Sequence, residues 1–163
     1  MGTKFNGEFT FNADAETAFG LISDAAYQKE KNEKTGGSDV EATRTDLDNG
    51  GVQLVVTRTL PAEVPSFAKK LVGETIETTQ TDTWDAANED GSRNGRTEIE
   101  FKGSPMSVTG TYKIANDGSG SKMTMNFEAK ASVPLIGGKI EKVVVEQTNR
   151  SVEAEQKIID SKL

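Results

Sequence analysis

Four polar side chains occupy positions where two strand-like stretches should turn inward. They are Arg58 in the stretch 52–60, and Thr78, Gln80 and Asp82 in the stretch 74–84. The other residues in the same alternation are apolar, and successive side chains of a strand point to opposite faces. A cavity that orients a ligand needs a few inward polar groups of this kind. A satisfied polar pair, or a strand end at the rim of a core, would give the same pattern, so a structural role is the alternative.

The spacing of these residues limits how they can pair with one another. If 52–60 and 74–84 form an antiparallel pair, Arg58 and Asp82 fall near its opposite ends. We therefore do not expect a salt bridge between them.

Two further polar residues lie among apolar neighbours later in the chain. Tyr112 shares the inward phase of the stretch 106–114, and together with nearby methionines it could form an adaptable wall around a lipid-like ligand. Ordinary core packing is the alternative. Gln147 shares a helix face with Ile140 and Val144, where a packed core would favour hydrocarbon. It points either into a hydrated cavity or to the edge of a pocket.

The absence of two residue types excludes much familiar chemistry. The 163 residues include no cysteine and no histidine. A thiol nucleophile, a Ser-His pair, and thiolate or imidazole metal ligands are therefore excluded. A buried Asp, Glu or Tyr can still perform acid-base work, because burial moves such a pKa by several units. We assign no catalytic residue, expect neither a metal nor a cofactor, and favour a protein that is not an enzyme.

Charge, length and hydropathy limit the partners. The net charge is -7, and the 19 basic residues form no cluster that could follow a phosphate backbone, so we expect no nucleic acid partner. No stretch approaches the roughly 20 apolar residues of a membrane span. Asp14 and Glu16 lie where a signal peptide would need an apolar run. We expect a single domain over residues 1–163, a cytoplasmic location and no stable membrane insertion, and the sequence identifies no protein partner.

A long run of strands and a few helices must position these side chains. Asn12 or Asp14 can cap a first helix, and Asp24 can cap a shorter second one that we expect to fray in the charged run 29–34. The residues at 48–51, Asp-Asn-Gly-Gly, predict a tight hairpin because Asn and Gly accept positive φ. The predicted strands are 3–11, 40–48, 52–60, 74–84, 97–101, 106–114 and 123–133, and a short helix is expected within 64–72.

The last stretch of the chain organises the others. From Ile136 to Ile159 apolar residues recur with helical spacing, with charged residues between them, so one face of a long helix needs burial. The strands have short connections and should pair antiparallel. Laying this helix across the concave side of a curved sheet is the simplest assembly that buries both apolar faces. We predict an α+β fold with about seven antiparallel strands around a C-terminal helix, and two short helices after the first strand.

Three segments carry a resemblance to a known family. They read LPAEVPSF at 60–67, KLVG at 70–73 and VPLIGGKIEK at 133–142. With the order of elements, they resemble an actinobacterial family of unknown function within the START-like (SRPBCC, helix-grip) superfamily, over almost the whole chain. The resemblance implies a seven-stranded sheet around the C-terminal helix with an apolar cavity between them, and ligands such as lipids, sterols or polyketides. The Gly-rich loop of the related plant allergens is not matched by 36–37 or 50–51, so their ligands do not transfer.

Three functions are compatible with these patterns. The one we favour is binding of a small hydrophobic or amphipathic ligand, of the lipid or polyketide class, between sheet and helix. The second is a cyclase-like enzyme acting on a polyketide through Tyr112, Asp82 or Arg58. The third is a partner-binding module with a packed core and an exposed apolar patch around Phe67 and Leu71. The residues expected to line the cavity are Val56, Arg58, Ile76, Thr78, Gln80, Ile99, Phe101, Val108, Tyr112, Met125, Phe127, Ile140, Val144 and Gln147, and those expected to form a lid are Val64, Phe67 and Leu71.

Overall fold

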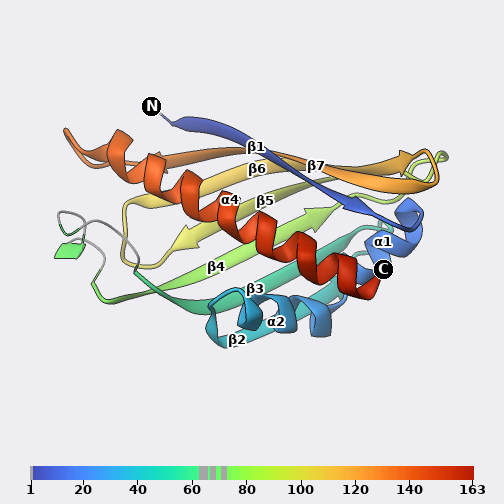
Figure 1. The fold of residues 1–163 in the computed structure, drawn as a ribbon, viewed down its shortest axis with the longest axis horizontal. Helices are drawn as coiled ribbons and strands as arrows, with labels where there is room; N and C mark the ends of the chain where they lie inside the picture. The colour runs from blue at the N-terminus through green and yellow to red at the C-terminus, as the bar shows by residue number, and fades with distance from the viewer. Residues whose placement is uncertain (1, 63–65, 67–68, 71–72) are drawn as a thin grey trace.

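The chain folds as a curved antiparallel sheet that grips one long helix (Figure 1). The computed structural model describes residues 2–62, 66, 69–70 and 73–163. The strands within these residues are β1 (Thr3–Phe11), β2 (Ser38–Asp46), β3 (Val52–Pro61), β4 (Thr75–Trp84), β5 (Arg93–Phe101), β6 (Met106–Asp117) and β7 (Gly120–Ala131). The helices whose bounds are described are α1 (Ala15–Ile22), α2 (Ala25–Lys34) and α4 (Gly137–Lys162). The predicted α+β architecture is confirmed.

The sheet joins the first strand to the last. Its seven strands have the order β1-β7-β6-β5-β4-β3-β2, and every neighbouring pair is antiparallel. The strand β2 forms one edge, and most of its side chains are exposed, as its polar sequence predicts. In Figure 1, α4 crosses the concave face diagonally, and α2 lies over β2 on the same face.

Helices α1 and α2 follow β1 directly, and each begins at an aspartate. Asp14 Oδ1 accepts a hydrogen bond from the backbone N–H of Thr17 at 2.8 Å. Asp24 Oδ2 accepts one from the backbone N–H of Tyr27 at 3.2 Å. These bonds satisfy amide groups that have no partner within a helix, so both predicted helix starts are confirmed, with Asp14 as the first cap.

The expectation that α2 frays in its charged run is wrong. The helix continues to Lys34, because one face of the run is buried. Asn32 is only 1% exposed and donates to the carbonyl of Gln28 at 2.7 Å, while Gln28 donates to the carbonyl of Ile22 at 2.6 Å. Tertiary burial therefore stabilises a segment whose composition alone predicts a solvated end.

Several strand ends differ from the predicted ones. The strand β5 begins at Arg93 rather than at residue 97, because its pairing with β6 extends to Arg93 opposite Ile114. This segment has a turn-like composition, so the earlier start of the strand could not be predicted from the sequence. Gly95 is required there for packing, since a Cβ at this position would lie 2.8 Å from the ring of Trp84. Smaller differences affect β2, which runs over 38–46, and β7, which ends at Ala131.

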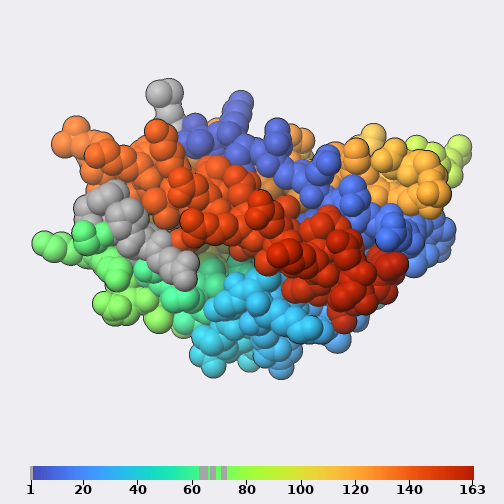
Figure 2. All heavy atoms as spheres, in the orientation of Figure 1, coloured from blue at the N-terminus to red at the C-terminus, as the bar shows by residue number. Residues whose placement is uncertain are grey.

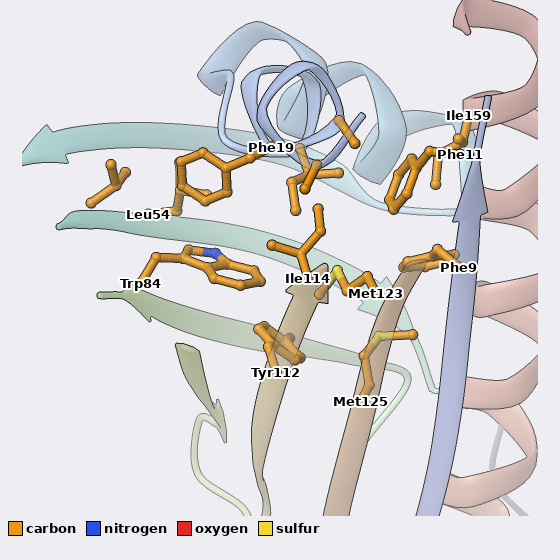
Figure 3. Close-up of a cluster of buried hydrophobic side chains, with 14 of the residues drawn as sticks. Phe9, Phe11, Phe19, Leu54, Trp84, Tyr112, Ile114, Met123, Met125 and Ile159 are labelled. Carbon is orange, nitrogen blue, oxygen red and sulfur yellow. The ribbon is translucent and has the colours of Figure 1, made fainter. Parts of the chain in front are cut away.

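A large hydrophobic cluster fills the end of the molecule near α1. Figure 3 shows Trp84 of β4 lying between Phe19 of α1 and Tyr112 of β6. The ring centroids of Trp84 and Tyr112 are 5.3 Å apart in a stacked arrangement, and those of Phe19 and Trp84 are 5.3 Å apart in an edge-to-face one. Buried side chains from β1, α1, β3, β4, β6, β7 and the end of α4 complete the cluster. This end of the molecule is therefore packed.

Helix α4 reaches a hydrophobic cluster near each of its ends, and Val145 and Val152 pack against the large cluster from its middle. Near its start Ile140 packs with Ile76 and Met106 in a second hydrophobic cluster, and near its end Ile159 belongs to the large cluster. The residues that border the space under its middle include three short side chains, those of Thr148, Ser151 and Ala154. A space lies beneath the face of the helix that carries these short side chains.

A buried carboxylate ties the start of α4 to both neighbouring strands. Glu141 is 4% exposed, and its Oε1 accepts a hydrogen bond from Thr3 Oγ1 at 2.6 Å. Its Oε2 accepts one from the backbone N–H of Ala131 at 3.0 Å. Burial opposes ionisation, but these two hydrogen bonds outweigh it and lower the pKa of Glu141. In the described part of the chain, no helix combines the length and the apolar character needed to cross a membrane.

Candidate ligand-binding cavity

A cavity of about 460 Å³ lies between the inner face of the sheet and the middle of α4. Sites for small molecules commonly have volumes of roughly 300–1,000 Å³, so this one is large enough for a ligand. Lining residues that are exposed mark where the cavity reaches the surface, at the end of α2, the end of β3 and the middle of α4. We call this region the mouth, and its exposed residues are Lys34, Gly36, Pro61 and Arg150.

Most of the cavity wall is apolar. Phe127 packs edge-on against Tyr112, with ring centroids 6.1 Å apart, and methionines from β7 fill the neighbouring positions. Thioether side chains adapt to irregular shapes, so this wall can fit more than one ligand outline. The apolar lining residues are Phe9, Ile22, Leu60, Trp84, Ile99, Phe101, Val108, Met123, Met125, Phe127, Val144 and Val152.

Most of the side chains predicted to face the cavity do border it. Three of them do not. Two, Ile76 and Ile140, pack against Met106 in the second cluster, near the start of α4. Val56 is buried beside β2, on the side of the sheet that α2 covers. The predicted lid residues Val64, Phe67 and Leu71 lie outside the described residues. The predicted residues that border the cavity are Arg58, Thr78, Gln80, Ile99, Phe101, Val108, Tyr112, Met125, Phe127, Val144 and Gln147.

Three polar residues form what we call the inner polar cluster: Gln80, Asp82 and Tyr112. The Gln80 amide donates to both carboxylate oxygens of Asp82, at 3.1 and 3.2 Å. The Tyr112 hydroxyl donates to Asp82 Oδ1 at 3.4 Å and lies 3.5 Å from the Gln80 amide nitrogen. All three border the cavity, with Asp82 and Tyr112 each 7% exposed. The cluster places hydrogen-bonding groups beside the apolar side chains of the wall.

Burial controls the protonation of this cluster. It raises the pKa of Asp82, and the neighbouring Thr97 hydroxyl and Gln80 amide offset the increase only in part. Burial also raises the pKa of Tyr112 well above its ordinary value, and the charge of Asp82 adds to that effect. Tyr112 therefore keeps its proton at neutral pH and can act as a donor.

A second polar group connects α2 to α4 beside the mouth. Tyr27 donates to Glu155 Oε2 at 3.0 Å, and Lys31 Nζ lies 3.2 Å from Glu155 Oε1. The side chains of Lys31 and Glu155 are each 12% exposed. Figure 2 shows α2 packed against the C-terminal half of α4, where this group lies. We call Tyr27, Lys31 and Glu155 the α2–α4 link; burial and the Glu155 charge together raise the pKa of Tyr27 far above its ordinary value.

Arg58 pairs with neither the inner polar cluster nor the α2–α4 link. The backbone register places it opposite Thr78, whereas Asp82 is opposite Leu54, so the expected separation of Arg58 and Asp82 is confirmed. The Arg58 guanidinium donates to Asn32 Oδ1 on α2. Burial lowers the pKa of Arg58, and attraction to Glu155 partly opposes that effect.

The sequence analysis missed the α2–α4 link and Asn32. Tyr27 and Lys31 are four residues apart on one helix, and Glu155 is four residues before Ile159, so each lies on the correct helix face. Nothing in a chain with many lysines and glutamates indicates which of them pair across such a separation. The charged composition of α2 did not indicate that this helix forms one wall of the site, so that wall was not predicted.

The cavity combines three chemical capacities. Its wall offers apolar surface. Its inner polar cluster offers hydrogen bonds and the Tyr112 proton beside the Asp82 carboxylate, and Arg58 offers a guanidinium near the mouth. Among residues 2–62, 66, 69–70 and 73–163, no group of three or more acidic side chains is placed to hold a metal ion. These features suit the binding and orientation of a small molecule.

Sequence comparison links the chain to one family. The sequence profile of the family described as "Protein of unknown function (DUF2505)" matches residues 7–163. A search of curated proteins finds no match.

Solved structures match almost the whole chain at low sequence identity. A STAR-related lipid transfer protein from Xanthomonas axonopodis is 18% identical with a TM-score of 0.62, and the match covers 96% of this chain and 85% of that one. A START superfamily protein from Mycobacterium smegmatis is 11% identical with a TM-score of 0.60, covering 98% and 99%. The Zhui aromatase/cyclase from Streptomyces sp. R1128 is 10% identical with a TM-score of 0.60, covering 99% and 93%. These matches confirm the predicted START-like helix-grip fold, and at such identities they establish the fold alone.

Proposed function

The chain belongs to this DUF2505 family, and we propose that it binds one small amphipathic molecule in the cavity beneath α4. The observation that carries the proposal is the cavity of about 460 Å³ itself, whose wall combines a larger apolar surface with the hydrogen-bonded groups of Gln80, Asp82 and Tyr112. A packed core of the same fold would fill this space, because protein interiors tolerate few voids larger than a water molecule.

Each part of the cavity has a role in this proposal. Burial of the apolar body of the ligand supplies affinity, at about 25 cal/mol per Å² of apolar surface removed from water. The inner polar cluster and Arg58 orient the polar ends of the ligand, since a ligand that left them unpaired would lose hydrogen bonds they make with water. The neighbours described as a lipid transfer protein and as an aromatase/cyclase support a ligand of the lipid or polyketide class.

Ligand binding can be tested with the single tryptophan of the chain. Trp84 borders the cavity, so a molecule that enters should change its fluorescence in a saturable way. The variant Ala154→Phe places a ring in the cavity and should weaken binding of medium-chain fatty acids and bicyclic phenols at least 10-fold. Val55→Phe, on the other face of β3, is the matched control and should bind within twofold of the parent. Equal binding by both variants would place the ligand elsewhere.

A second candidate function is suggested by the contact between Asp82 and Tyr112. A carboxyl with a raised pKa can act as a general acid at neutral pH, and Tyr112 lies 3.4 Å from it with its own proton retained. The cavity could then protonate a ligand carbonyl during ring closure of a polyketide. In that case Asp82→Asn and Tyr112→Phe should abolish turnover of a poly-β-ketone while binding persists. Binding without turnover by the parent protein would leave only the binding function.

The packed partner-binding module receives less support. It requires a closed core, whereas the grip encloses a cavity. The apolar patch expected around Phe67 and Leu71 lies outside the described residues.

A further inference from the structure

The cavity wall beside the mouth holds a guanidinium with unused donors. Arg58 has five N–H donors and remains charged at any relevant pH. Its hydrogen bond goes to the neutral side chain of Asn32, and no carboxylate among the described residues lies within ion-pair distance of it. Buried cations normally have an anionic partner, because removing an unpaired charge from water is costly. Among the described residues Glu155 attracts the Arg58 charge only from beyond ion-pair distance, so no carboxylate of this part of the chain contacts the guanidinium directly.

A second unused donor lies directly beside the first. Thr78 faces Arg58 across the β3–β4 pair. The residue is 3% exposed, and its hydroxyl has no hydrogen-bond partner within the part of the chain that the structure describes. Both residues border the cavity and are neighbours across the β3–β4 pair. Two adjacent donor groups of this kind fit an acceptor with two oxygens.

The charges around the mouth favour the same kind of ligand. The cations that border this region are Lys31, Lys34, Arg58 and Arg150. Lys31 pairs with Glu155 and Lys34 with Glu30, so Arg58 and Arg150 are the cations here with no ion pair among the described residues. This excess of positive charge contrasts with a net charge of -7 for the whole chain. Local positive potential of this kind attracts anions toward an opening.

We propose that the ligand is an amphipathic carboxylic acid whose carboxylate accepts hydrogen bonds from Arg58 and Thr78. This inference rests on the proposed binding function and specifies its ligand class. A planar carboxylate matches the fork of a guanidinium, which can donate two parallel hydrogen bonds to it. The apolar body then runs along β4 toward Asp82, four residues further along the strand, a distance of about 13 Å.

Two matched pairs of probes separate the carboxylate from the apolar body. Decanoate is compared with decan-1-ol, and 2-naphthoate with 2-naphthol, by titration calorimetry at pH 7.5. A charge-assisted hydrogen bond contributes enough to change affinity roughly 10- to 100-fold. At least one acid should therefore bind at least 10-fold more tightly than its alcohol, and Arg58→Met should remove that difference while leaving the affinity for the alcohol within twofold.

Three further variants guard against indirect effects. Thr78→Val keeps the shape of the side chain and should weaken binding of the acid about 3- to 10-fold through loss of one hydrogen bond. Arg58→Lys keeps the charge without the fork and should fall between the parent and Arg58→Met. Lys157→Met changes the net charge equally at an exposed position of α4 away from the cavity and should bind like the parent.

The possible outcomes distinguish this inference from the function on which it rests. If the alcohols bind as tightly as the acids and Arg58→Met changes neither, the carboxylate assignment is overturned while ligand binding stands. If none of the four probes binds to the parent protein, both are overturned. Thermal unfolding of each variant establishes that the fold is retained, and loss of folding in Arg58→Met would leave Thr78→Val and Arg58→Lys to decide.

Discussion

The largely buried ion pair between α2 and α4, whose two side chains are each 12% exposed, allows a quantitative test of how these helices are held together beside the cavity. The variant Glu155→Leu removes the carboxylate and leaves Lys31, only 12% exposed, without its partner. Breaking a buried pair from one side typically costs about 3–5 kcal/mol, because the remaining charge stays desolvated. Some water reaches this pair beside the mouth, so we expect the lower end, about 3 kcal/mol. For a domain of this size that corresponds to a fall in melting temperature of roughly 6–12 °C.

The double variant makes the reasoning specific. Lys31→Met alone should cost a similar amount, because it leaves the Glu155 carboxylate without a cation and with the Tyr27 hydroxyl as its remaining partner in the α2–α4 link. Replacing both residues by apolar ones removes the unpaired charge, so Lys31→Met with Glu155→Leu should cost no more than either single change, about 3 kcal/mol rather than 6. Urea unfolding followed by Trp84 fluorescence measures all four free energies. Glu153→Gln, an exposed carboxylate on the same helix, is the control and should change stability by less than about 0.5 kcal/mol.

An additive result would refute this reasoning. If the double variant lost the sum of the two single losses, the two side chains would contribute separately through packing, and the pair would not be the unit that joins the helices. A neutral result for Glu155→Leu alone would likewise mean that water solvates Lys31 once its partner is gone.

Three further predictions concern single residues. Asp82→Asn should gain stability relative to the parent as the pH rises above 3.8, because burial raises the pKa of Asp82 and folding then opposes its ionisation. Urea unfolding at several pH values measures this, and a difference in unfolding free energy that did not change with pH would contradict it. Glu141→Gln should destabilise the protein by about 1–3 kcal/mol at pH 7, and this loss should shrink as the pH falls below 4.5, because protonation of a carboxylate with a lowered pKa removes its stabilising effect. A loss of stability that did not change with pH would mean that the charge of Glu141 does not contribute. Gly95→Ala should destabilise the protein by about 1–3 kcal/mol and alter the near-UV circular dichroism of Trp84, since the added methyl group would lie 2.8 Å from the ring. An unchanged spectrum would mean that the backbone of β5 moves and the ring of Trp84 does not.

The fold was predictable because hydrophobic alternation and turn residues agree along most of the chain. Inward phases in β3, β4, β6 and β7 follow directly from period-two patterns, and the C-terminal helix from its apolar face. Local signals failed where tertiary contacts decide the structure. The helix α2 holds its charged run through buried side chains, and β5 extends through a segment rich in turn residues because β6 offers a full set of partners.

The site was predictable only in part, for a physical reason. Periodicity identifies which side chains face inward, so Arg58, Thr78 and Gln80 could be placed from the sequence. It cannot say where along α4 the packing ends, since Ile140 and Val144 look equivalent on a helical wheel although only Val144 borders the cavity. Ion pairs between distant helices carry no periodic signal either, which is why Glu155 was missed.

Native mass spectrometry of the protein purified from the organism that encodes it tests most directly whether the cavity is a binding site. Organic extraction and identification of any retained compound would follow. We predict a stoichiometric small molecule with an apolar body and a carboxylate, and its absence from Ala154→Phe purified in the same way. A parent protein that carries no compound, and that gains no thermal stability from fatty acids or polyketides, would contradict the binding function.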